Sequence, residues 1–261
     1  MKRTIYYFSA TGNSLHVSKS IAEILGDCAL LSIPSLRQCE TITADSEMVG
    51  FVFPLYYFGI PPMVSEFIQK IRMEKVKYSF VVVTSGMGRH VSSALRQADD
   101  LFAQKGRHLD AGFHVAMISS YIPLSDIPPT EKMHQKLAKA DLKIQEIAST
   151  LLSEKPFREA EPFRVPLHAY HKFWKNHQLP HVHQKFFCTS SCTSCGTCEK
   201  VCPVNNIRMK DNKPQWLENC QECLACLHFC PAKSIEFGGR TKGRRRYHHP
   251  KVSVADIIRS K

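Results

Sequence analysis

Short apolar runs alternate with amphipathic stretches through the first 152 residues of the chain. Five runs are rich in β-branched and aromatic residues and end at turn residues, as buried parallel strands do. They are residues 3–8, 28–33, 48–53, 78–84 and 111–119. Apolar residues recur at helical spacing in residues 15–25, 63–73, 91–104 and 130–152. This alternation predicts an α/β fold, a doubly wound five-stranded parallel sheet with helices on both faces.

The loop after the first predicted strand is rich in hydroxyl groups and leads directly into a helix. Backbone N–H groups in such a loop, together with the helix N-terminus, favour an anion such as phosphate. The loop lacks the lysine of an ATP-binding P-loop and the three glycines of a dinucleotide fingerprint. An ordinary helix cap is the alternative reading. The residues predicted to bind the anion are Ser9, Thr11, Gly12, Asn13, Ser14 and Leu15.

Three further loops follow predicted strands, at the edge where open α/β sheets bind their ligands. Aromatic residues beside glycine and proline follow the third strand and suit a flat ligand, or else pack on the next helix. Glycines after the fourth strand allow a close backbone approach to a ligand. The candidate ligand-binding residues here are Pro54, Tyr56, Tyr57, Phe58, Gly59, Ser85, Gly86, Met87, Gly88 and Tyr121.

Eight of the eleven cysteines form two similar runs near the C-terminus, which is an internal repeat. Each run has the spacing Cys-x-x-Cys-x-x-Cys-x-x-x-Cys-Pro, which is typical of 4Fe–4S cluster ligation. A zinc site normally takes four ligands from two separated pairs, and a disulfide scaffold suits a small secreted chain. Both alternatives explain the repeated third and fourth cysteines less well. The candidate ligands are Cys192, Cys195, Cys198, Cys202, Cys220, Cys223, Cys226 and Cys230.

The cysteine-rich stretch, about residues 187–237, resembles a bacterial two-cluster ferredoxin. In that family the fourth cysteine of each run ligates the other cluster. The resemblance therefore implies one cluster on Cys192, Cys195, Cys198 and Cys230, and a second on Cys220, Cys223, Cys226 and Cys202. The family's fold implies a small α+β domain.

Residues 1–152 resemble a flavodoxin, through the loop from Ser9 to Ser14 and through the strand pattern. The resemblance implies the strand order 2-1-3-4-5 and FMN, with its phosphate at that loop and its ring at the aromatic and glycine-rich loops. Many flavodoxins place acidic residues near the flavin, whereas this chain has Arg89 and His90 after the fourth strand. Positive charge there would favour the reduced anionic flavin, unless both side chains point to solvent.

The remaining segments are a connector and a basic tail. The predicted division is a flavodoxin-like FMN-binding domain (1–152), the connector (153–187), a ferredoxin-like domain (188–237) and the tail (238–261). The connector holds five histidines and Trp174, and a short helix over 167–176 is expected to pack the two domains together. Eight Lys and Arg residues against one Asp give the tail much of the net charge of +12. The tail has three possible interpretations: a solvated face, a segment that tunes redox potentials or docks a partner, or a nucleic-acid-binding segment.

The chain as a whole resembles the flavodoxin/ferredoxin fusion proteins of anaerobic bacteria and archaea. The resemblance implies electron transfer between two 4Fe–4S clusters and FMN, linking one-electron and two-electron redox partner proteins. A reductase of a small-molecule acceptor and a redox sensor with a nucleic-acid-binding tail are alternatives, although nucleic acid is disfavoured. No apolar run reaches transmembrane length, no signal sequence is evident, and thiolate ligands need reducing surroundings. A cytoplasmic protein without a membrane span is therefore expected.

Overall fold

The computed structural model describes residues 1–162 and 165–261, and its largest element is a six-stranded parallel sheet. The strands are β1 (Arg3–Tyr7), β2 (Cys28–Ser32), β3 (Met48–Pro54), β4 (Tyr78–Ser85), β5 (Ala111–Ala116) and β6 (Phe157–Arg158). Their spatial order is β2-β1-β3-β4-β5-β6. This confirms the doubly wound α/β fold and the order of the first five strands.

The sixth strand corrects the expectation of a five-stranded sheet. Phe157 and Arg158 pair in parallel with Ala111 and Gly112 of β5, and the Phe157 ring stacks on Phe113 at 5.2 Å between centroids. Two residues cannot display an alternating pattern, so periodicity could not indicate this strand. The start of the connector therefore belongs to the large sheet.

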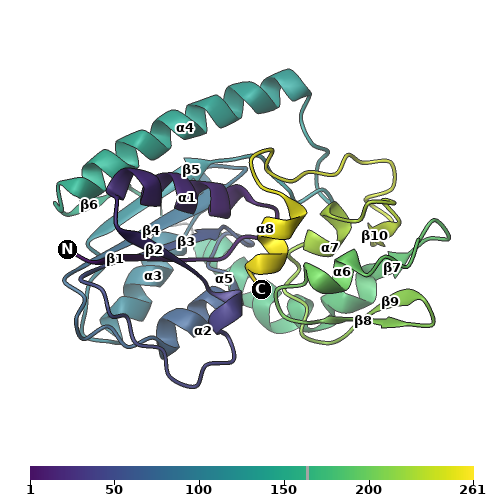
Figure 1. The fold of residues 1–261 in the computed structure, drawn as a ribbon, viewed down its shortest axis with the longest axis horizontal. Coiled ribbons are helices and arrows are strands. Elements are labelled where there is room, and N and C mark those ends of the chain that lie inside the picture. Colours follow the sequence, from purple (N-terminus) through teal and green to yellow (C-terminus); the bar gives the residue numbers. More distant parts are fainter. Residues whose placement is uncertain (163–164) are drawn as a thin grey trace.

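Helices cover both faces of the sheet, as Figure 1 shows: α1 and α4 lie on one face, and α2 and α3 lie on the other. Their bounds are α1 (Asn13–Leu25), α2 (Pro62–Lys70), α3 (Ala94–Ala103) and α4 (Thr130–Leu152). The strands β3 and β4 are buried along nearly their whole length, which explains why they read as continuous apolar runs.

The cysteine-rich region forms a small α+β unit beside the sheet (Figure 1). Its elements are β7 (Phe186–Cys188), α6 (Thr197–Lys200), β8 (Ile207–Lys210), β9 (Lys213–Trp216), α7 (Ala225–His228) and β10 (Ile235–Phe237). β7 pairs with β10 and β8 pairs with β9, both antiparallel. The two cysteine runs repeat one backbone conformation. Ser194 and Glu222 have φ of 56° and 53°, and Gly196 and Leu224 have φ of 70° and 60°.

Two segments join this unit to the sheet. Helix α5 (Val165–Phe173) continues into a π-helical turn (Trp174–Gln178) and a 3₁₀ segment (Leu179–Lys185), and this spans the helix expected at 167–176. At the other end, the tail crosses back to the sheet and ends in α8 (Val254–Arg259), drawn in yellow between the two units in Figure 1.

The end of the tail is anchored on the large sheet. The Ser260 hydroxyl hydrogen-bonds the Tyr7 hydroxyl at 2.8 Å, and the side chains of Val252 and Ile257 are buried. The hydroxyl of Ser253 and the carboxylate of Asp256 form a reciprocal capping box at the start of α8. The apolar end of the tail therefore packs against the first unit.

Within the part of the chain that the structure describes, no helix has the length and apolar character required to span a bilayer.

Candidate cofactor sites

The candidate flavin residues gather at the carboxyl edge of the sheet, where β1, β3, β4 and β5 end. Direct contacts join their loops. The Ser14 hydroxyl at the start of α1 lies 2.8 Å from the Thr84 hydroxyl of β4. The Asn13 amide donates to the Ile118 carbonyl after β5 at 2.9 Å, and the Tyr57 hydroxyl meets the Tyr121 hydroxyl at 2.5 Å. The fold therefore brings the four sequence-distant loops to one place.

The phosphate loop, residues 9–14, presents an array of backbone donors. The Gly12 N–H bonds the Ser9 hydroxyl at 3.2 Å, and Gly12 itself has φ of 95°, which favours glycine. The N–H groups of Thr11, Asn13 and Ser14 have no hydrogen-bond partner among the described residues, although all three residues are at most 9% exposed. Buried unpaired N–H groups at the N-terminus of a 13-residue helix fit the phosphate of FMN.

The tail covers this loop. The His249 N–H donates to the Thr11 carbonyl at 2.8 Å, and the Tyr247 hydroxyl donates to Oδ1 of Asn13 at 2.7 Å. A Cβ on Gly12 would lie 2.8 Å from Cβ of Val252, so no larger residue fits there. None of the readings of the tail from the sequence included this contact with the phosphate loop.

The loop after β3 is a strained tight turn. Tyr56 and Gly59 exchange both backbone hydrogen bonds, at 3.0 and 2.9 Å, while Tyr57 and Phe58 between them have φ of 43° and 73°. Positive φ costs of order 1 kcal/mol or more for bulky residues, and such strain concentrates at functional sites. The turn aims the Tyr57 ring at the connector, where it stacks on the Trp174 indole at 4.4 Å between centroids. One face of Tyr57 is thus occupied by protein.

The loop after β4 is more open. A Cβ on Gly86 would lie 2.4 Å from Cβ of Ser119, so the loop can approach the β5 exit only with glycine there. The Gly88 N–H donates a hydrogen bond to the Ser85 hydroxyl at 2.9 Å, and Met87 is 59% exposed. The side chains next along the chain, Arg89 and His90, are also exposed.

The eight candidate cluster ligands line two separate small cavities. Cys192, Cys195, Cys198 and Cys230 line one cavity. Cys202, Cys220, Cys223 and Cys226 line the other. Each cavity thus takes three cysteines from one run and the fourth from the other, as the ferredoxin resemblance implies.

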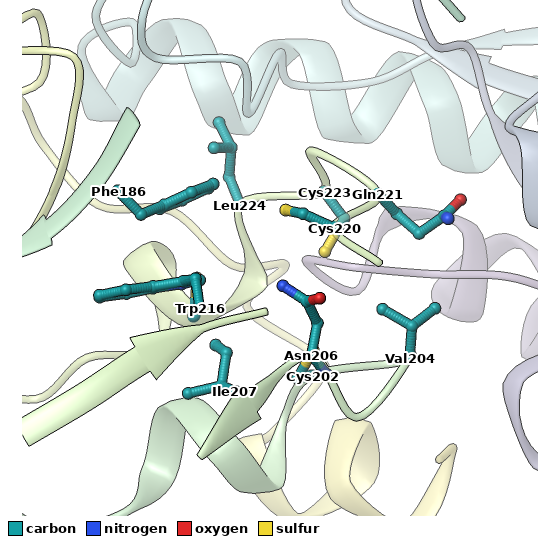
Figure 2. A pocket seen from close by; sticks show the side chains of 11 residues that line it. Phe186, Cys202, Val204, Asn206, Ile207, Trp216, Cys220, Gln221, Cys223 and Leu224 are labelled. Carbon is teal, nitrogen blue, oxygen red and sulfur yellow. The ribbon is translucent and has the colours of Figure 1, made fainter. Parts of the chain in front are cut away.

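The second cavity carries buried donors suited to cluster sulfur. The Asn206 side-chain amide is buried and has no hydrogen-bond partner among the described residues, whereas the buried Trp216 Nε1 faces the Cys226 sulfur. Both residues line the cavity with Cys220 and Cys223 (Figure 2). The backbone N–H of Asn206 also points at the Cys202 sulfur, 3.2 Å away. Buried donors facing sulfur ligands fit an iron–sulfur cluster, which accepts such hydrogen bonds.

Burial keeps two of the candidate ligand thiols protonated when no metal is bound. Burial raises the pKa of Cys198 to about 11 and that of Cys220 to about 12, so these sulfurs carry negative charge only when a metal replaces the proton. Among the described residues, no three His, Cys, Asp or Glu side chains converge closely enough to hold a single metal ion. The cysteines instead line the two cavities in groups of four.

Glu222, between two ligands of the second group, joins the two halves of the molecule. Its carboxylate is 5% exposed and accepts from the Tyr57 hydroxyl at 2.6 Å, the Tyr121 hydroxyl at 2.8 Å and Trp174 Nε1 at 2.8 Å. Burial, reinforced by this carboxylate, holds the pKa of both tyrosines above the usual range, so both remain donors. The ligand loop therefore packs directly on two candidate flavin residues.

A second contact joins the same two units. The His228 ring in α7 bonds the Ser120 carbonyl at 2.7 Å, and its other nitrogen accepts the Tyr247 N–H at 3.1 Å. His171 of α5 contacts the Tyr56 and Tyr57 carbonyls at 3.1 Å each. Only the aromatic and histidine content of the connector hinted at this interface, and no local motif marked Glu222.

Comparison with known proteins identifies both units. Residues 4–116 match the family described as a flavodoxin domain, and residues 191–235 match the 4Fe-4S dicluster domain. A 53-residue stretch is 40% identical to a subunit of the ion-translocating oxidoreductase complex of Methanosarcina acetivorans. That match covers 20% of this chain, which spans only about a fifth of the length of that curated relative.

Three solved structures are among those that match part of this chain. A flavodoxin from the domain Archaea is 14% identical, with a TM-score of 0.34 over 57% of this chain and 99% of its own. A short-chain flavodoxin associated with a bacterial microcompartment is 13% identical, with a TM-score of 0.35 over 57% and 99%. The Trp repressor binding protein of Bacillus subtilis is 16% identical, with a TM-score of 0.34 over 54% and 96%.

The two family matches define the class: a flavoprotein domain joined to an iron–sulfur domain, with FMN implied by the first and 4Fe–4S clusters by the second. The chain therefore carries a flavodoxin domain followed by a 4Fe-4S dicluster domain, which is the arrangement of a flavodoxin/ferredoxin fusion, and both domains support electron transfer.

Proposed function

We propose that this protein passes electrons between FMN at the carboxyl edge of the sheet and two 4Fe–4S clusters, and so links one-electron to two-electron redox partner proteins. Clusters exchange single electrons, whereas bound FMN takes one or two. The cluster ligands would be the two groups of four cysteines that line the two cavities. The flavin would be held by the phosphate loop and the loops after β3, β4 and β5.

The Glu222 contact carries this proposal. A ligand loop that hydrogen-bonds Tyr57 and Tyr121 holds the second cluster next to the flavin loops. The first group includes Cys195, which is exposed, while Cys226 in the second group is buried. Electrons would therefore enter or leave at the first cluster and reach the flavin through the second.

Direct reduction of a small molecule is the competing function. It needs a flavin ring that a substrate can reach, yet Trp174 and His171 pack over the loop after β3. The tail arginines also have internal partners that favour a structural role over nucleic-acid binding. Arg244 and Arg245 donate to the Ile122 and Ile127 carbonyls, and Arg246 pairs with the buried Glu236 at 3.0 Å.

Cofactor content and single-turnover reduction test the proposal. Anaerobically purified protein should hold about eight irons, eight sulfides and one FMN per chain. After rapid mixing with a limiting one-electron reductant, cluster bleaching should precede flavin reduction at a rate independent of protein concentration. A flavin rate proportional to protein concentration would refute the intramolecular path. Saturable steady-state turnover of a quinone or nitro compound would favour the reductase.

A further inference from the structure

We propose that His249 in the tail is a phosphate-binding residue of the FMN site, and that the tail closes that site by laying this imidazole against the phosphate loop. The proposal rests on the proposed FMN site. It adds to that site a residue about 240 positions beyond the phosphate loop, outside the matched flavodoxin domain at residues 4–116.

His249 is locked in place beside the first turn of α1. The residue is 1% exposed, and its N–H bonds the Thr11 carbonyl at 2.8 Å. Its ring stacks on the His16 ring at 4.1 Å between centroids, and His16 is held in turn by Asp141 at 2.7 Å. A Cβ on Gly12 would lie 3.0 Å from Cβ of His249. The imidazole therefore flanks the helix terminus that presents the unpaired N–H groups.

The hydrogen-bond pattern fixes which ring nitrogen is free to donate. The Lys251 N–H donates to Nδ1 of His249 at 3.3 Å, so Nδ1 is an acceptor and Nε2 carries the hydrogen. Nε2 is buried and has no partner among the described residues. A buried donor without an acceptor is destabilising, and the residue that carries it is tied to the phosphate loop by the bond from its N–H to the Thr11 carbonyl. An anion bound at the loop would accept from this donor and from the unpaired backbone N–H groups of the loop.

Contacts on both sides of His249 hold the tail in place against the two units. Before His249, the Tyr247 N–H binds His228 of α7 and the Tyr247 hydroxyl binds Asn13 of the phosphate loop. After it, Val252 and Ile257 are buried. Displacing His249 would break contacts with both units, so a flavin held this way exchanges slowly.

The test compares FMN with riboflavin, which lacks the phosphate. Flavin-free protein would be titrated by fluorescence quenching as wild type, His249→Ala and His249→Gln, with His181→Ala at an exposed connector histidine as the matched control. Loss of one hydrogen bond to a charged group predicts at least about tenfold weaker FMN binding for His249→Ala. Riboflavin affinity should be unchanged, and His249→Gln, which keeps a donor, should recover part of the FMN affinity.

Three results separate the outcomes. Equal FMN affinity for wild type and His249→Ala would overturn the role of His249, and equal weakening of FMN and riboflavin would show packing instead of phosphate binding and overturn it too. If wild-type protein binds neither flavin, the proposed FMN site itself fails. The ³¹P resonance of bound FMN supplies an independent readout, which should shift in His249→Gln if the imidazole contacts the phosphate.

Discussion

Replacing Glu222 by alanine should loosen the contact between the cysteine-rich unit and the sheet. The buried carboxylate accepts three hydrogen bonds, and its loss leaves the Trp174 donor and one of the two tyrosine hydroxyls without an acceptor, because the Tyr57 and Tyr121 hydroxyls can still bond each other. Each buried donor left unpaired costs about 1–3 kcal/mol, so even after local relaxation the loss should reach about 3 kcal/mol. For a protein of this size, that lowers the unfolding midpoint by roughly 6–12 °C.

The assay is thermal unfolding of the anaerobic holoprotein at one fixed scan rate, followed by circular dichroism. Glu222→Gln should lose much less, because the amide oxygen can still accept from Trp174 while the tyrosine hydroxyls rotate to accept from its nitrogen. Glu218→Ala changes an exposed carboxylate two residues before the ligand Cys220 and is the matched control. A Glu222→Ala protein with full clusters that unfolds within about a degree of Glu218→Ala would refute the reasoning.

Three further predictions follow from the same structure. Cys202→Ala should abolish the cluster of Cys220, Cys223 and Cys226 and leave the other cluster intact. Iron analysis should then show about four irons, and electron paramagnetic resonance should show one remaining signal. Loss of the cluster on Cys192, Cys195 and Cys198 instead would contradict the crossed pairing. Burial lowers the pKa of His171 to about 4, from about 6.5 unfolded, so its contribution to stability is complete above pH 6.5 and declines as the pH falls toward 4. At pH 5 that loss is about 2 kcal/mol, and His171→Gln should show a correspondingly smaller drop in urea midpoint between pH 7 and 5; an identical drop would exclude this residue as the cause. Ser253→Ala removes the capping box of α8, so it should cost about 1 kcal/mol and speed hydrogen exchange in α8, with Ser149→Ala on the exposed surface of α4 as control.

The sequence alone was sufficient to predict a structural feature where a local pattern of residues encodes that feature. Continuous apolar runs marked β3 and β4 because both are buried between helix layers, and the repeated spacing of the cysteines placed them in two groups. The glycines at 12 and 86 were expected to let a ligand approach, and in the structure both positions leave no room for a side chain, because a Cβ would meet Val252 and Ser119. In these cases the cause of the structure lies within a few residues of the pattern.

What the sequence missed depends on contacts between distant segments. Strand β6 has two residues, and its stability comes from pairing with β5 and from the Phe157 ring on Phe113. Glu222 resembles any surface carboxylate until three donors from three other segments surround it. The tail arginines read as a charged face, yet Arg246 is buried against Glu236. Such contacts follow from the three-dimensional packing and have no local signature.

The bond between Ser260 and Tyr7 has a mechanical consequence, because these residues are 253 positions apart in the chain. The cysteine-rich unit is attached to the sheet at both of its ends, through the connector on one side and through the tail on the other. A domain on a single linker can swing and meet several docking sites in turn, whereas a unit fastened at two points can turn only about the line that joins them, and the Glu222 contact opposes that rotation as well. If the proposed cofactor sites are correct, the spacing between clusters and flavin is therefore built into the fold.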